Sequence, residues 1–196
     1  HPLSMLNYQH IYKETNYICT RNIMEMQKSN LNTPLANNHI SVDCVVVGFD
    51  GDRLKVLLIK RVGDDEGLAF HDMKLPGSLI YKDEDLDGAA MRVLSELTGL
   101  KNVDLIQFKA FGTKNRTSNP KDVRWLERAQ KAQVESIVTI AYLALVKIDR
   151  ALSRNLETFQ ADWVALDDIQ DLAFDHNLII KEALVYIRQY VESNPA

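Results

Sequence analysis

The feature that most constrains the fold of this chain is one short, well-bounded amphipathic segment. Over residues 85–98, apolar side chains recur at helical spacing and define a single face. Acidic residues at 83–85 crowd its start, where carboxylates complement the helix dipole, and Gly99 stands where a C-terminal cap belongs. A helix with one apolar face has to bury that face against another layer. The face comprises Leu86, Ala89, Ala90, Val93, Leu94 and Leu97.

Apolar, β-branched runs supply the layer on which this helix can pack. Asp50-Gly51 separates the first two runs and is typical of a tight hairpin turn. Residues 63–74 are predicted as a loop, and residues 177–191 as a second amphipathic helix. The order of elements indicates a mixed sheet with helices packed on it. The predicted strands are residues 42–47, 54–59, 79–81, 103–111, 137–148 and 163–166.

Composition excludes several classes of function. The 196 residues carry 23 basic and 27 acidic side chains, and the net charge of −4 gives no global field for nucleic acid or an anionic membrane. The two cysteines, Cys19 and Cys44, form no CxxC pair and favour a reducing compartment. The sequence has no uninterrupted apolar stretch of about 18 residues. We therefore expect a cytoplasmic protein with no membrane partner.

The first residues differ in character from the rest of the chain. Residues 1–4 precede Met5 and are predicted to be a tag remnant. The polar, Asn-rich stretch that continues to residue 38 is predicted to be an N-terminal leader. We expect the folded domain to span residues 39–192.

One set of residues spans the turn and the first helix at fixed spacings. It resembles the Nudix box, in which a Gly is followed after five residues by Glu and after seven more by Arg-Glu. The box then continues, in order, with an aliphatic residue, any residue, Glu-Glu, any residue, Gly and a final aliphatic residue. The resemblance covers roughly residues 40–190 and implies the Nudix fold, an α+β (α/β/α) sandwich of a mixed β-sheet with helices on both faces. The matching residues are Leu75, Pro76, Gly77, Glu84, Arg92, Leu94, Glu96, Gly99 and Leu100.

Three positions depart from the box. Ser78 stands in place of a Gly, and Val93 and Leu97 stand in place of two helix glutamates. At about 100° per residue, carboxylates at 93, 96 and 97 would form one acidic patch that can hold Mg²⁺ or Mn²⁺. This chain keeps only Glu96 there, with Glu84 at the helix start. We expect weak metal binding at Glu84 and Glu96, no required cofactor and little hydrolysis.

The same residues also have simpler interpretations. Glu84 can be a first-turn helix residue and nothing more, and Arg92 with Glu96 can be a surface pair worth about 0.3–0.5 kcal/mol. Val93 and Leu97 are best explained as residues that line the core.

The sequence of residues 92–100 resembles one branch of the family, the Nudix-related transcriptional regulators. In these proteins the Nudix domain senses a small molecule, ADP-ribose or L-arabinose among them, and a winged-helix domain follows it. Residues 138–145 and 172–176 also resemble this branch. The resemblance implies the effector-sensing domain of a homodimeric repressor that contacts DNA only through the winged helix. We expect residues 193–196 to begin the linker to such a domain, which this sequence does not contain.

The expected effector pocket lies between the first helix, Arg61 and residues 111–116. Arg61 and Arg116 are expected to face anionic or polyhydroxy groups of the effector, which is a nucleotide-sugar, a related nucleotide or a pentose. The remaining predicted ligand-binding residues are Glu84, Arg92 and Glu96.

Two rival functions stay open. One is an active Nudix pyrophosphohydrolase acting on a nucleoside diphosphate derivative, which would need substitute carboxylates from Asp83, Asp87 or Glu135. The other is an interaction module whose ligand site is vestigial. His176, which precedes the second helix, is either an acid–base group or, as is commoner, a structural hydrogen-bonding residue.

Residues 114–136 form a basic insert. Between residues 114 and 131, six basic side chains oppose two acidic ones, and the spacing of the apolar residues predicts a partly amphipathic helix. Arg124, Arg128 and Lys131 would form one positive stripe. We expect a solvated face that Trp125 packs onto the domain, with a phosphate-binding lid or a DNA-facing patch as the alternatives.

Overall fold

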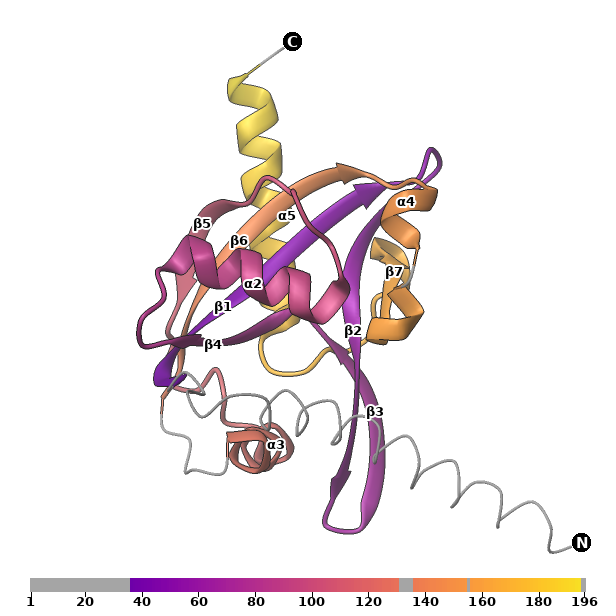
Figure 1. Ribbon diagram of the computed structural model, residues 1–196. Coiled ribbons are helices and arrows are strands. Elements are labelled where there is room, and N and C mark those ends of the chain that lie inside the picture. Colours follow the sequence, from indigo (N-terminus) through magenta and orange to yellow (C-terminus); the bar gives the residue numbers. More distant parts are fainter. Residues whose placement is uncertain (1–35, 131–135, 155, 195–196) are drawn as a thin grey trace, which may run out of the picture. The chain divides into compact units, whose positions relative to one another are not determined.

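The computed structural model describes residues 36–130, 136–154 and 156–194. A mixed seven-stranded sheet forms the centre of this part of the chain (Figure 1). Its central strand, β1 (Ala36–Phe49), runs parallel to β6 (Val138–Lys147), which pairs antiparallel with β5 (Ile106–Phe111). On its other side, β1 pairs first with β4 (Gly77–Tyr81) and only at its end with β2 (Leu54–Asp65). The two partners of β1 therefore share one of its edges.

β2 continues past its pairing with β1 into a hairpin with β3 (Leu68–Lys74), an edge strand of the sheet, while its first half pairs with β7 (Ala161–Ala165). The sequence predicts a loop over residues 63–74, and this prediction is wrong. The hairpin turns at Glu66 and Gly67, whose φ angles of 55° and 86° are those of a two-residue type I′ turn. The outer half of the hairpin (Figure 1) is mostly exposed or half-buried, so it lacks the buried apolar run by which strands are recognised.

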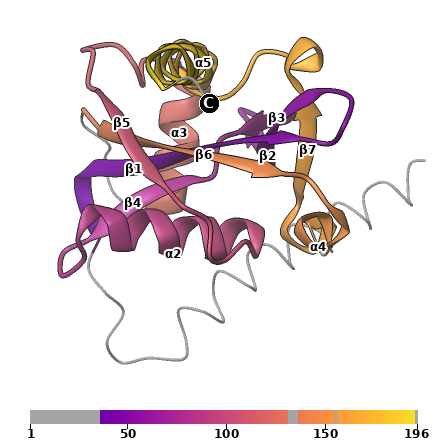
Figure 2. The same cartoon turned by 90° about the horizontal axis from the view of Figure 1, so that it is seen from above.

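Helices cover both faces of the sheet, which confirms the predicted sandwich (Figure 2). α2 (Leu86–Thr98) and the short α4 (Arg150–Ser153) lie on one face, and α5 (His176–Ser193) lies on the other. α3 (Pro120–Gln130) contacts the β2–β3 hairpin and confirms the helix expected within the insert. In the described residues, no helix is long and apolar enough to cross a membrane. Two 3-10 turns complete the fold, η1 (Leu156–Phe159) and η2 (Leu166–Asp168).

α2 begins and ends where its local sequence requires. The Asp85 carboxylate accepts the N–H of Gly88 at 2.6 Å and caps the first turn. Gly99 has a φ of 73°, and its N–H donates to the carbonyl of Ser95. A Cβ at this position would be strained and would also run into the ring of Phe159. The cap therefore fixes both the length of α2 and its approach to the neighbouring turn.

β1 is buried on both faces, and its side chains alternate between two apolar cores. Val42, Cys44 and Val46 face the α2 core, whereas Val45 and Val47 face the α5 core, and each is at most 2% exposed. On the α2 side the helix contributes Ala89, Ala90, Val93 and Leu94. On the α5 side the helix contributes Ile179, Ile180 and Ala183.

Candidate functional site

The predicted box residues come together at the start of α2. Arg92 Nε and Nη2 donate to the two carboxylate oxygens of Glu84 at 2.6 and 2.8 Å, and Nη1 donates to Glu96 at 3.1 Å. The guanidinium also lies over the ring of Tyr81, 3.9 Å from its centroid. Hydrogen bonds from Arg92 hold the pKa of Glu84 below its usual range. We call Glu84, Arg92 and Glu96 the box cluster.

The two replaced box positions lie in the core. Val93 is fully buried in the cluster that includes Cys44 and Tyr142, and Leu97 packs against that cluster. The interpretation of Val93 and Leu97 as core-lining residues is therefore confirmed. A carboxylate at position 93 would have to be desolvated within an apolar environment, whereas one at the half-buried position 97 would be desolvated only in part.

The donor set on α2 does not fit a resident divalent cation. Mg²⁺ and Mn²⁺ take several oxygen ligands, but only Glu84 and Glu96 supply carboxylates, and both already accept hydrogen bonds from Arg92. Within residues 36–130, 136–154 and 156–194, no three His, Cys, Asp or Glu side chains converge in a way that could hold a metal ion. Weak metal binding at the two glutamates stays a prediction.

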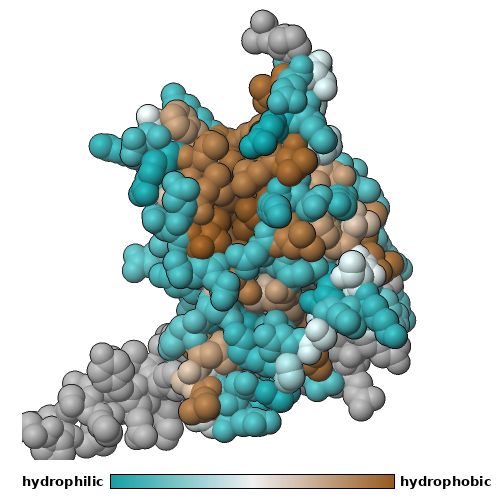
Figure 3. Space-filling model, turned by 180° about the vertical axis from the view of Figure 1, so that it is seen from behind, coloured by the Kyte–Doolittle hydropathy of each residue, from teal (hydrophilic) through white to brown (hydrophobic). Residues whose placement is uncertain are grey.

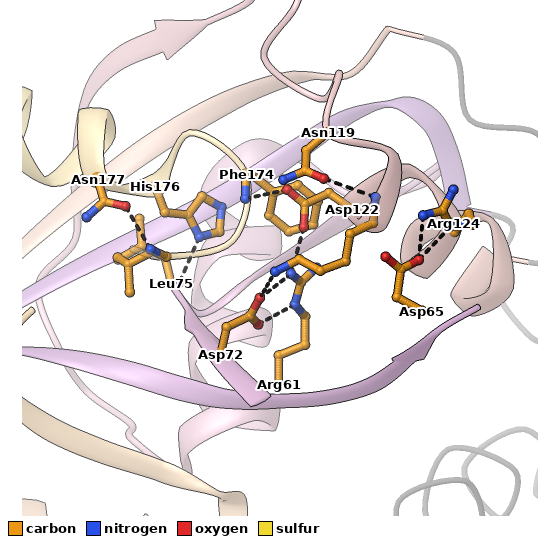
Figure 4. Close-up of polar contacts among 12 residues, drawn as sticks. Arg61, Asp65, Asp72, Leu75, Asn119, Asp122, Arg124, Phe174, His176 and Asn177 are labelled. Carbon is orange, nitrogen blue, oxygen red and sulfur yellow. Dashed lines mark hydrogen bonds and ion pairs between the residues drawn. The ribbon is translucent and has the colours of Figure 1, made fainter. Parts of the chain in front are cut away.

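Arg61 lies in a buried ionic cluster (Figure 4). It is 3% exposed, and its Nε and Nη2 donate to the Asp72 carboxylate at 2.7 and 2.6 Å. Nη2 also donates to Asp122 of α3 at 2.6 Å, whereas Nη1 has no hydrogen-bond partner. Three aromatic rings surround the guanidinium, with centroids 5.0–5.2 Å from its central carbon: Phe70, Trp125 and Phe174. The cluster ties α3 to the β2–β3 hairpin.

Arg116 is also buried and paired. It donates to both carboxylate oxygens of Asp175 at 3.0 and 2.8 Å and to the carbonyl of Ile137 at 3.2 Å. We call Arg61, Asp72, Arg116, Asp122 and Asp175 the insert cluster. The predicted ligand-binding residues thus fall into two groups, the box cluster and the insert cluster, and a ligand role for either stays a prediction.

The insert helix packs as expected but on a partner that the sequence did not predict. Trp125 meets the ring of Phe174 edge-on at 6.3 Å, which confirms that it packs the insert onto the domain. Arg124 pairs with Asp65 at 2.7 Å, and Arg128 donates to the carbonyl of Asp64, both at the hairpin turn. The basic stripe therefore rests on an acidic turn instead of facing only solvent. Lys131 lies outside the described residues.

A buried polar group holds the Leu-Pro-Gly turn that leads into β4. Lys74 Nζ donates to the carbonyls of Leu75 and Gly77 at 3.2 and 3.0 Å, and the Leu75 N–H donates to His176 Nδ1 at 2.9 Å. A Cβ at Gly77 would overlap the Asp43 carboxylate, so only glycine fits. The interpretation of His176 as a structural hydrogen-bonding residue is confirmed. Sequence reasoning missed Asp43 and Lys74.

Protonation of this group follows from its burial. Burial lowers the pKa of His176 to about 4, so the ring is uncharged at neutral pH. Nδ1 accepts the hydrogen bond from Leu75, so Nε2 carries the proton, and Nε2 lies 3.5 Å from a carboxylate oxygen of Asp43. Burial also lowers the pKa of Lys74 to about 8. A polar Asp within the apolar run of β1 was the one sequence signal for this group.

Comparison with known proteins places the chain in a family. The model of the NUDIX domain matches residues 37–184. This chain belongs to the NUDIX domain family. A search of curated proteins gave no match.

Several solved structures share the fold of this NUDIX domain. NrtR of Shewanella oneidensis is 26% identical with a TM-score of 0.58, over 77% of this chain and 64% of NrtR. This chain therefore spans less than two thirds of NrtR. The NUDIX domain of NrtR, solved with ADP ribose, is 23% identical with a TM-score of 0.56, over 84% and 97% of the two chains. A mutT/nudix family protein from Listeria innocua is 23% identical with a TM-score of 0.59, over 83% and 99%.

Two of the three carboxylates proposed as substitutes for a hydrolase lie within the described residues of this NUDIX domain. Asp87 accepts the hydroxyl of Tyr142 at 2.6 Å, and Asp83 is exposed at the turn before α2. Glu135 lies outside the described residues. Asp87 is therefore held by a side chain of the sheet beneath α2.

Proposed function

We propose that this NUDIX domain binds a nucleotide-sugar of the ADP-ribose type, a related nucleotide or a pentose, and hydrolyses it little. The proposal rests on the state of the box. Val93 and Leu97 belong to the α2 core, and Arg92 occupies the two remaining carboxylates. Without a carboxylate patch, the helix cannot clamp a metal ion against a diphosphate, which is the step that metal-assisted hydrolysis needs.

The relatives support a sensing function. NrtR has been crystallised with a 27mer DNA, and its NUDIX domain with ADP ribose. By this proposal, the domain is the effector-binding part of a homodimeric, cytoplasmic transcriptional regulator, and DNA is contacted by a domain outside these residues. The mutT/nudix family protein of Listeria innocua carries neither an effector nor DNA in its name, so hydrolysis stays the rival function.

Arg61 and Arg116 are the proposed contacts for anionic groups of the effector. Each guanidinium is held by aspartates of the chain, so a phosphate would replace a carboxylate as the partner of a cation that is already desolvated. Such an exchange requires the displaced aspartate to shift toward water or another donor, because a buried carboxylate without its cation is costly. Glu84, Arg92 and Glu96 are proposed to line the α2 side of the same site.

Calorimetric titration with ADP-ribose, a pentose and AMP tests the proposal. We expect saturable binding, a ligand-dependent rise in melting temperature and little AMP release with Mg²⁺ or Mn²⁺. Arg116→Ala should weaken binding of a diphosphate, and affinity should fall with salt. Arg53→Ala, at an exposed arginine paired with Asp168, is the matched control. Rapid AMP release would establish the hydrolase, and no binding of any compound would leave a vestigial module.

A further inference from the structure

Four consecutive residues, the last of which begins α5, contact three other parts of the structure: the β2–β3 hairpin, the insert and the turn before β4. We call residues 173–176 the α5 junction. The N–H of Ala173 donates to the carbonyl of Met73 in β3 at 2.9 Å, and the N–H of Phe174 donates to the Asp122 carboxylate of α3 at 2.9 Å. The first half of the junction therefore links the hairpin to the insert helix.

The second half of the junction makes two more side-chain links. Asp175 receives both hydrogen bonds from Arg116, which precedes α3, and His176 accepts the N–H of Leu75 in the turn before β4. Figure 4 shows the His176–Leu75 and Phe174–Asp122 contacts beside the Arg61 cluster. Arg116 therefore contacts the junction directly through Asp175, and Arg61 is linked to it through Asp122.

The centre of the junction is held in an uncommon conformation. Phe174 has a φ of 57°, a region that side chains other than glycine rarely adopt and that persists only where the surroundings hold it. Its ring packs against Trp125 and His176, with centroids 6.3 and 5.2 Å away, and it covers the guanidinium of Arg61. Two members of the insert cluster, Arg61 and Asp122, are thus among the groups that hold Phe174.

α5 begins directly at this point. The helix has 18 residues, about 27 Å at 1.5 Å per residue, and its far end projects past the sheet (Figure 1). Tyr190 and Val191 near that end are 51% and 58% exposed, and an apolar surface lies beside the helix (Figure 3). A rigid helix anchored at one end converts a small shift at its first turn into a larger displacement at its tip.

We propose that the α5 junction couples occupancy of the effector site to the position of α5. This inference rests on the proposed function of Arg61 and Arg116. When an anionic group takes either guanidinium, Asp122 or Asp175 is released. Because the other oxygen of Asp122 holds the N–H of Phe174, and Asp175 directly precedes α5, a shift of either carboxylate moves the junction. The two arrangements of the junction then differ in their affinity for the ligand.

Hydrogen exchange of the full chain with and without ADP-ribose tests the coupling. The N–H groups of Leu178 and Ile179 donate to the carbonyl of Asp175 and report the first turn of α5. We expect exchange in α3 and in this turn to change together, by about fivefold or more, the lower end of measured couplings. Exchange in the buried middle of α2 should stay constant.

Each other outcome overturns a different statement. Binding with a change confined to α3 would overturn the coupling and leave the proposed function intact. No binding, together with unchanged exchange throughout, would overturn both.

Two variants of Asp122 test the coupling by hydrogen exchange in the absence of ligand. Asp122→Ala deprives the N–H of Phe174 of its acceptor, whereas Asp122→Asn keeps one acceptor oxygen for that N–H and gives up the carboxylate oxygen that pairs with Arg61. We expect Asp122→Ala alone to show faster exchange at the first turn of α5, and Asp122→Asn to restore the original rate. Asp171→Ala, at an exposed residue just before the junction, is the control for a nonspecific effect. Equal exchange in the Ala and Asn variants would contradict the coupling.

Discussion

Restoring the two missing glutamates should expose the conflict between the α2 core and a metal site. Val93 is fully buried, so Val93→Gln loses about 1.5–3 kcal/mol of apolar burial. Leu97 is half-buried, and a polar side chain there can reach water, so its loss is smaller. We expect the double Gln variant to be destabilised by about 3 kcal/mol, and the double Glu variant by several kcal/mol more at pH 7.

Mn²⁺ should stabilise the double Glu variant far more than the double Gln variant. The double Glu variant gains oxygen ligands beside Glu96. Mn²⁺ at about 100 times its Kd should therefore raise the free energy of unfolding of this variant by about 2.7 kcal/mol. The double Gln variant has nearly the same shape but no charge, and it should gain far less. Urea unfolding followed by tryptophan fluorescence, with and without Mn²⁺, measures both effects. Equal stability of the unmodified chain and the Glu variant without metal would refute the burial of these positions.

Three further predictions concern the insert and the turn. Trp125→Ala should lower the free energy of unfolding by about 2 kcal/mol, less than is typical for a fully buried indole. Unfolding in urea measures this loss. Because burial lowers the pKa of His176 from 6.5 to about 4, stability should be full above pH 6.5 and fall by about 3 kcal/mol as the pH drops to 4. His176→Asn keeps an acceptor for Leu75 and should flatten that slope, and an unchanged slope would contradict the argument. Residues 1–196 should not discriminate between operator-like and scrambled duplexes in a gel shift at about 0.15 M salt, since Arg124 and Arg128 are held by the hairpin.

α2 could be predicted because its signals are local in the sequence, whereas the ion pairs could not be predicted because their partners lie far apart in the sequence. The acidic start, the periodic apolar face and Gly99 all lie within one segment, and the structure reproduces the helix one residue shorter, with Asp85 as its N-cap. Arg61, by contrast, is paired with Asp72 and Asp122, which lie 11 and 61 residues further along the chain. No local pattern indicates such a pair, so the sequence could place the arginine at a strand but could not show its burial.

The hairpin was missed for a related reason. Its outer strands lack a buried face, and the contacts that hold them come from α3, in part through Arg124 and Asp65. The two-residue turn at Glu66 and Gly67 was the sequence signal available for the hairpin. Strands were predicted only where an apolar run was present, so this signal was not used. The box departures were informative because periodicity alone assigned Val93 and Leu97 to the core, and the structure confirms that assignment.

Single-turnover incubation tests the central claim most directly. An excess of the full chain is mixed with ADP-ribose and Mn²⁺, the bound fraction is separated, and intact ADP-ribose and AMP are quantified over time. We predict that ADP-ribose is recovered intact from the complex, because α2 lacks the carboxylates that would hold a metal ion against the diphosphate. Conversion of the bound ligand to AMP at the rate of an ordinary hydrolase would contradict the account.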